Sequence, residues 1–162
     1  MNESLKTALL AQANHELFAA LSYEAMGYWC LSEDYSGFAE FFFKQASEER
    51  EHASKFFNHL LDRGVAPVIE AAEKPAGTFN RITELARLAQ VLEKKNSDMI
   101  KECFRIAQEC AEYDSWPLLL EFIDEQVEEE AWTAKMVHLT TRAECPGALY
   151  NLDRHINKEL AE

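Results

Sequence analysis

Residues 47–52 read SEEREH, which places three carboxylates, an arginine and an imidazole in six consecutive positions of a phenylalanine-rich segment. Glu49 and His52 lie at i and i+3, so on a helix they share one face. The apolar residues around them recur at spacings of three and four, and Glu49 takes a core position in that apolar stripe. A buried carboxylate costs several kcal/mol unless a cation or hydrogen bonds compensate for it.

Other segments of the chain also place a glutamate on an apolar stripe, and each does so within a few turns of its middle. These glutamates are Glu16, Glu93 and Glu129. Antiparallel packing would bring them to the height of Glu49, on stripes that carry no lysine or arginine at these positions. Glutamate and imidazole suit ferrous or ferric iron, manganese or zinc. The pattern predicts a two-metal centre inside a helical bundle, with Gln126 and Tyr23 close enough to orient its ligands by hydrogen bonds.

The other charged residues of these segments have simpler interpretations. Glu51 faces away from Glu49 and is predicted to pair with Lys55 at i+4 on the surface. The remaining histidines are expected to be structural or exposed. The apolar stripe of the fourth segment is predicted to consist of Leu118, Phe122, Glu125, Glu129, Trp132, Met136 and Leu139.

Four long helices must position these side chains. The helical periodicity, the prolines and the glycines predict helices over residues 4–31, 37–63, 81–111 and 115–143, and a short one over 148–160. Residues 64–79 contain two prolines and two glycines and are predicted to be a long non-helical connection. Short first and third connections with a long second one indicate an all-α fold, an antiparallel four-helix bundle with a crossover between helices two and three. Residues 1–162 are expected to form one domain.

Charge and cysteine usage restrict the function further. The formal net charge of −13 argues against nucleic-acid or anionic-membrane partners. No apolar run is long enough to span a bilayer, and the first residues lack the pattern of a secretory signal. The four cysteines form no C-x-x-C pair, which argues against a zinc or rubredoxin-type site and favours a reducing compartment. We therefore expect a cytoplasmic protein, with an organelle left open if a transit peptide has been removed.

The sequence resembles the non-haem ferritins of the prokaryotic type over nearly the whole chain. The segments that carry the resemblance are HELFAALSYEAMGYWC, SEEREH, VLEKKNSDMI, DEQVEEE and PGALYNLDRHINKEL. As a set, at this spacing, they are specific, although each alone would be weak. The resemblance implies an iron-storage protein with ferroxidase activity, which oxidises ferrous iron with dioxygen and deposits ferric mineral inside a cage of 24 subunits.

The resemblance also implies a role for individual residues. A first iron would be bound by Glu16, Glu49 and His52, with Glu49 bridging to a second. The second iron would be bound by Glu93 and Glu129, with Gln126 nearby and Tyr23 beside the centre. A third iron position would be formed by Glu48, Glu125 and Glu128. Tyr23, Glu49 and Gln126 would take part in catalysis, Tyr23 either as an electron donor or as a hydrogen-bond donor.

Some positions depart from the patterns of related families. Arg50 stands where bacterioferritins carry a haem-binding methionine, and Gln126 and Glu129 replace their second Glu-x-x-His motif, so no haem is expected. The segment SWPLLLE is mostly apolar where animal ferritins line an iron channel with acidic residues. Two other functions remain open: a small di-iron oxidase acting on an organic substrate without storage, and a helical interaction module whose buried glutamates set the register.

Overall fold

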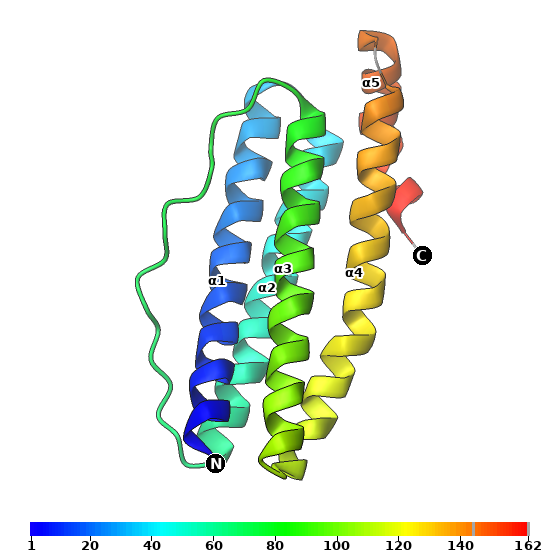
Figure 1. Cartoon of the computed structure of the whole chain (residues 1–162). Coiled ribbons are helices and arrows are strands. Elements are labelled where there is room, and N and C mark those ends of the chain that lie inside the picture. The colour runs from blue at the N-terminus through cyan, green and yellow to red at the C-terminus, as the bar shows by residue number, and fades with distance from the viewer. Residues whose placement is uncertain (144, 162) are drawn as a thin grey trace.

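The computed structural model describes residues 1–143 and 145–161. These residues form helices joined by non-helical connections, and they contain no strand (Figure 1). The helices are α1 (Glu3–Ser32), α2 (Ser36–Asp62), α3 (Ile82–Glu109), the short 3-10 helix η1 (Tyr113–Ser115), α4 (Trp116–Arg142) and α5 (Pro146–Leu160). The predicted all-α fold class is confirmed. No helix in the described residues is long and apolar enough to cross a membrane.

The long connection between α2 and α3 runs along the outside of α1, from one end of the bundle to the other (Figure 1). Asn14 on α1 fixes its path: the side-chain amide donates to the carbonyl of Val68 (3.0 Å), and the side-chain oxygen accepts from the backbone N–H of Glu70 (2.8 Å). Because this crossover returns the chain to the far end, α2 and α3 run in the same direction. The predicted bundle with one long crossover is confirmed.

The ends of the helices follow local backbone rules. The side chain of Asn2 accepts from the backbone N–H of Ser4 (2.8 Å) and caps α1. Gly64 has a φ of 74° directly after α2, a conformation that favours glycine. Helix α3 ends at Glu109 because Ala111, which we predicted to be helical, has a φ of 54°.

The core of the bundle consists of two apolar clusters. One lies toward the N-terminal end of α1 and includes Leu5, Leu9, Phe56, Leu60, Ile100, Leu119 and Phe122. The other lies toward its C-terminal end and includes Met26, Phe38, Phe42, Leu85, Met136 and Ile156. Each large side chain buried in this way stabilises the fold by about 1.5–3 kcal/mol. The two clusters therefore hold the bundle from both ends, and the layer between them can accommodate polar residues.

Helix α5 folds back on α2 and α4. The Asp153 side chain accepts from the backbone N–H of Phe38 (2.9 Å), and the Asn157 amide donates to the carbonyl of Gly37 (3.1 Å). A Cβ atom at position 37 would lie 1.8 Å from the backbone oxygen of Asp153, so this approach requires glycine. The short fifth helix that we predicted is thus part of the described fold.

The buried face of α4 differs from the predicted stripe. Leu118, Glu125, Trp132 and Leu139 are half-buried, and the buried residues are Leu119, Phe122, Gln126, Glu129, Thr133, Met136 and Thr140. The predicted stripe was therefore wrong at every second position, where the buried residue is the one that follows the predicted residue in the sequence. The face is turned so that Gln126 points into the core and Glu125 lies at its edge.

Candidate metal centre

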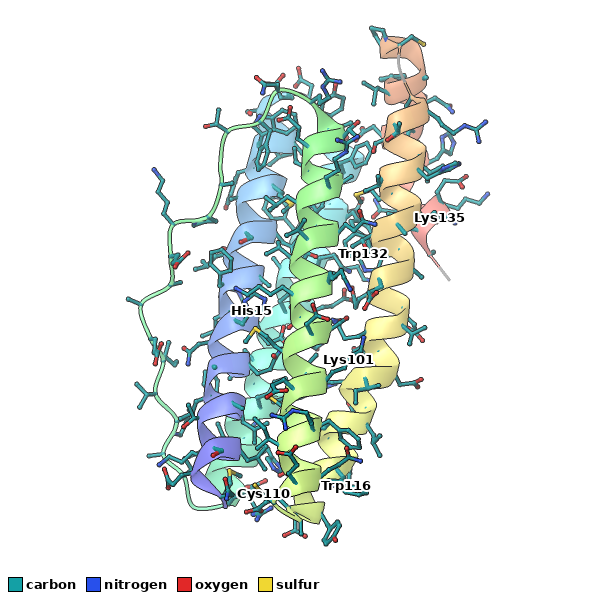
Figure 2. The ribbon with its side chains drawn as sticks, viewed as in Figure 1. His15, Lys101, Cys110, Trp116, Trp132 and Lys135 are labelled. Carbon is teal, nitrogen blue, oxygen red and sulfur yellow. The ribbon has the colours of Figure 1, made fainter. Side chains whose placement is uncertain are left out.

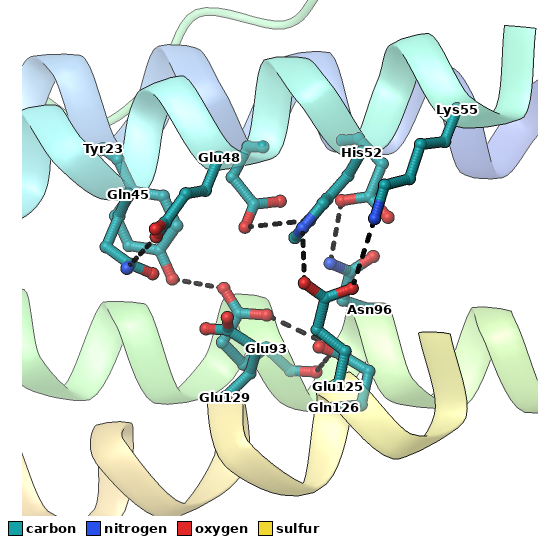
Figure 3. Close-up of polar contacts among 12 residues, drawn as sticks. Tyr23, Gln45, Glu48, His52, Lys55, Glu93, Asn96, Glu125, Gln126 and Glu129 are labelled. Atoms are coloured by element: carbon teal, nitrogen blue, oxygen red, sulfur yellow. Dashed lines mark hydrogen bonds and ion pairs between the residues drawn. The ribbon is translucent and has the colours of Figure 1, made fainter. Parts of the chain in front are cut away.

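Four glutamates of the predicted stripes, one on each long helix of the bundle, are buried between the two apolar clusters. Glu16, Glu49 and Glu93 are fully buried, and 9% of Glu129 is exposed. His52, on α2, is also buried. Figure 3 shows His52, Glu93 and Glu129 directed into one region of the bundle from three different helices. The structure therefore brings together all five residues that we expected at the centre.

Glu16, Glu49 and His52 form the tightest group. Each offers one ligand atom, and these atoms lie within 4.8 Å of one another. Nδ1 of His52 is 3.7 Å from Oε1 of Glu49, too far for a hydrogen bond but suitable for two ligands of one ion. Among the described residues, no second set of three His, Cys, Asp or Glu side chains is this close.

Glu49 has an unusual environment for a carboxylate. Neither of its oxygens accepts from an amide, hydroxyl or ring N–H in the described part of the chain, although both are buried, and its carboxyl can hydrogen-bond to that of Glu16 only while one of the two is protonated. Burial, and then the nearby charge of Glu93, raises the pKa of Glu49 well above its usual value. A buried carboxylate without a partner is costly, and a cation bound between Glu49 and its neighbours would remove that cost. The donor set of two carboxylates and an imidazole suits a divalent cation.

His52 is oriented by a carboxylate on α4. Its Nε2 lies 3.1 Å from Oε1 of Glu125. Burial lowers the pKa of His52, but the hydrogen bond to Glu125 and the charge of Glu16 outweigh it, so that the pKa is raised. A metal would bind the neutral ring, in which the Nε2 proton is donated to Glu125 and the lone pair of Nδ1 is directed toward Glu49, an arrangement that orients a metal-binding imidazole.

The residues on α3 and α4 are held by hydrogen bonds instead. The hydroxyl of Tyr23 donates to Oε1 of Glu93, and the amide of Gln126 lies 3.4 Å from Oε2 of the same residue. The indole N–H of Trp132 donates to Glu129.

Burial is the main reason that the pKa values of Glu93 and Glu129 are raised. The charge of Glu16 raises the pKa of Glu93 further, and the charge of Glu93 raises that of Glu129. Burial, and then the charge of Glu93, also raises the pKa of Tyr23, which keeps its hydroxyl protonated as a donor.

The residues of the predicted third position surround a cavity of about 470 Å³ between α2 and α4. Glu48 and Glu125 are half-buried and Glu128 is exposed. Glu48 accepts from Gln45 (2.5 Å) and lies 3.1 Å from Nζ of Lys44. These carboxylates line the same cavity as Glu129, which belongs to the buried centre.

Sequence reasoning missed several contacts. Lys55 pairs with Glu121 (2.7 Å) and approaches Glu125 (4.0 Å), both on α4, instead of forming the predicted pair with Glu51. The packing of α2 on α4 places these partners nearer than the next turn of the same helix.

Polar partners of the centre were missed in the same way. Gln12 donates to Glu16, and Trp132, which we had placed only in the apolar stripe of the fourth segment, also donates to Glu129. The i, i+4 spacing of Gln12 and Glu16 was the signal available for the first of these contacts.

His15 illustrates a buried histidine without such a role. Figure 2 shows it on α1, and it is directly adjacent to Glu16 in the sequence. Burial, assisted by the charge of Lys95, lowers the pKa of His15 to about 4, so the ring is neutral. This agrees with the structural role that we expected.

Comparisons with known proteins agree with this arrangement. The sequence model of the ferritin-like domain matches residues 6–143. The bacterial non-heme ferritin of Staphylococcus aureus is 36% identical over 157 residues, which covers 96% of this chain and 95% of the relative. That of Staphylococcus epidermidis is 33% identical over 142 residues, covering 88% and 86%. A crystal structure of an open pore ferritin from the hyperthermophilic archaeon Archaeoglobus fulgidus superposes with a TM-score of 0.93 at 26% identity, covering 100% of this chain and 99% of that one. The chain belongs to the ferritin family, as its sequence motifs predicted.

Proposed function

We propose that this protein is a ferroxidase and an iron store, which oxidises ferrous iron with dioxygen at the buried centre and keeps the ferric product as a mineral. One observation carries the proposal most directly: Glu49 is fully buried beside Glu16 and His52, and neither of its oxygens has a partner among the described residues. Membership of the ferritin family supports iron as the cation.

In this proposal the first ferrous ion is held by Glu16, Glu49 and His52. The second is held by Glu93 and Glu129, and Glu49 is shared between the two. Gln126 and Tyr23 act through hydrogen bonds to Glu93. Carboxylates suit this chemistry because they bind both ferrous and ferric iron and change between bridging and chelating modes.

The reaction that we propose is a two-electron oxidation. Two ferrous ions lose one electron each, and dioxygen accepts both electrons with two protons to give hydrogen peroxide. The ferric ions then take hydroxide from water, which releases protons, and leave as oxyhydroxide. Binding of the ions also releases protons, because the carboxylates with raised pKa values must ionise.

The cavity between α2 and α4 is the proposed route of the product. Glu48, Glu125 and Glu128 line it, and we propose that they form a third iron position on the way out. A cage of 24 subunits would enclose the mineral.

The proposal includes no haem. Arg50 pairs with Glu24 (2.7 Å) at the position where a haem ligand would be needed. All four cysteines are free, which supports a cytoplasmic location.

The alternative is a small di-iron oxidase that acts on an organic substrate. To separate the two functions, ferrous iron would be added in air in large excess over two ions per chain, followed by size-exclusion chromatography with detection of protein and iron. Storage requires that soluble iron elutes with a particle many times heavier than the monomer. Binding that stops near two ions per chain on a small species would contradict storage.

Glu49→Gln, which removes the charge of the shared ligand, should abolish the catalysed oxidation. Glu109→Gln, on an exposed side chain, serves as the matched control.

A further inference from the structure

Glu16 is held by two amides from two different helices. The side-chain N–H groups of Gln12 donate to Oε1 of Glu16 (2.7 Å), and those of Asn96 donate to Oε2 (2.9 Å). Gln12 also donates to Oδ1 of Asn96 (2.5 Å), which closes a triangle of hydrogen bonds between α1 and α3. Figure 3 shows Asn96 beside the centre, and all three residues are buried.

The other carboxylates of the centre are held differently. Glu49 has no partner among the described residues, and Glu129 accepts from Trp132. Glu93 accepts a short bond from Tyr23, but its contact with Gln126 is long at 3.4 Å. Glu16 is therefore the carboxylate with a well-formed donor at each oxygen.

We propose that Gln12 and Asn96 are positioning residues, which fix the orientation of Glu16 so that it binds a cation in one constant mode. This inference rests on the proposed function, because it requires a cation at the centre. Fixing Glu16 leaves Glu49 as the carboxylate that changes its binding mode during oxidation.

Amides are suited to this task because they are neutral and because two hydrogen bonds occupy only part of the carboxylate. An ionised carboxylate has about four lone-pair positions, so two hydrogen bonds leave positions free for a cation. A lysine in the same place would supply a positive charge that competes with the cation. A neutral amide fixes the orientation without that competition, and in a buried site a hydrogen bond to a charged group is stronger than one in water.

The test is an anaerobic titration with Co²⁺, followed by its visible absorption, on the full-length protein and two variants. Asn96→Leu removes one donor at similar volume, and Gln12→Met removes the other. We expect Asn96→Leu to weaken the tighter cobalt site by about 10–100-fold, the range found when partners of metal ligands are removed. The absorption spectrum should change as well, because a released Glu16 binds cobalt in a different mode.

Ser97→Ala is the matched control. Ser97 follows Asn96 on α3, is fully buried, and its hydroxyl has no partner among the described residues. Removing it should leave both the cobalt affinity and the spectrum unchanged. If Asn96→Leu does not fold, as judged by circular dichroism, Gln12→Met decides the question by the same criteria.

Glu49→Gln separates a failure of this inference from a failure of the proposed function. If this variant binds Co²⁺ as the native protein does, the metal centre itself is wrong. If it loses binding while Asn96→Leu and Gln12→Met keep the native affinity and spectrum, the positioning role is overturned. A weaker affinity with an unchanged spectrum would also overturn it, because it would show that the amides contribute packing only.

Discussion

The two halves of the buried centre are held in different ways. On α1 and α2, the ligand atoms of Glu16, Glu49 and His52 lie within 4.8 Å of one another, and Glu49 has no partner among the described residues. On α3 and α4, Glu93 and Glu129 are each engaged by a donor, from Tyr23 and Trp132.

This difference indicates an order of binding. The half on α1 and α2 is assembled before a cation arrives, so little rearrangement opposes binding there. In the half on α3 and α4, both carboxylates already carry a donor, Tyr23 at Glu93 and Trp132 at Glu129. Protons must be displaced in both halves, because the pKa values of Glu16 and Glu49 are raised as well. We expect the first ion to bind at α1 and α2, and its charge to favour ionisation of the other half.

Glu49→Gln should have the largest effect, because it alters the ligand that we propose both halves share. We expect the catalysed oxidation of ferrous iron, followed by absorbance in air, to fall to the rate of iron without protein. The metal-free variant should nevertheless be more stable by about 1 kcal/mol or more in urea unfolding at pH 8, since burial raises the pKa of Glu49 and the folded protein must either protonate the carboxyl or bear its buried charge, neither of which glutamine requires. A loss of both activity and stability would show that Glu49 supports the fold instead.

The metal-free protein should become less stable as the pH rises. The usual pKa of a glutamate is 4.5, whereas it is raised to about 7 in Glu93 and about 8 in Glu129, with burial as the main cause in both. The folded state therefore binds more protons than the unfolded state, and the stability that is present below pH 4.5 is lost as the pH rises through 7 and 8. Glu16, Glu49 and His52, whose pKa values are also raised, act in the same direction. His15, whose pKa is lowered to about 4, acts in the opposite direction, but only below its usual pKa of 6.5.

Urea unfolding at pH 5.5 and pH 8 measures this effect. We expect the free energy of unfolding to fall by an amount on the order of 3 kcal/mol between the two, since a tenfold change in a proton-binding constant corresponds to about 1.4 kcal/mol. The slope should decrease in Glu129→Gln. A stability that rises over this range would show that the carboxylates are ionised in the folded protein and that the comparison between the two halves is wrong.

Glu129→Gln should affect one half only. We expect an anaerobic Co²⁺ titration to lose the second ion while the first binds as in the native protein, because Glu16, Glu49 and His52 are intact. Oxidation of ferrous iron should slow by more than about 10–100-fold, the loss found when only a partner of a metal ligand is removed. Equal weakening of both ions would mean that the halves bind as one unit.

The four-helix fold could be predicted from the sequence because each helix repeats its apolar spacing over many turns. Every predicted helix end lies within two residues of the observed one. The rotation of α4 could not be predicted in the same way. Residues 118–120 are all leucine and residues 124–130 are mostly acidic, so the stripes through Glu125 and Gln126 fit the pattern equally well. Packing against α3 and α5 decided between them.

The carboxylates of the centre could be predicted because a charge on an apolar stripe conflicts with burial. Gln12 and Asn96 produce no such conflict, since an amide is neutral and tolerated at the edge of a core. Their role depends on α1 and α3 meeting at one height, which is a property of the three-dimensional structure. Lys55 was assigned to Glu51 for a related reason: a spacing within one helix is visible in the sequence, and a partner on another helix is not.

Tyr23→Phe should have the smallest effect and addresses the half on α3 and α4 alone. The variant keeps the ring in the apolar cluster and removes the hydroxyl that donates to Glu93. A hydrogen bond to a charged group contributes about 1.5–3 kcal/mol, so the second Co²⁺ ion should bind about tenfold more weakly, with the first unchanged. If the second ion binds normally but oxidation of ferrous iron slows, Tyr23 acts as an electron donor and not as a positioning group. If neither changes, the hydrogen bond from Tyr23 does not hold Glu93 for the cation, and the contrast between the two halves must rest on burial and charge alone.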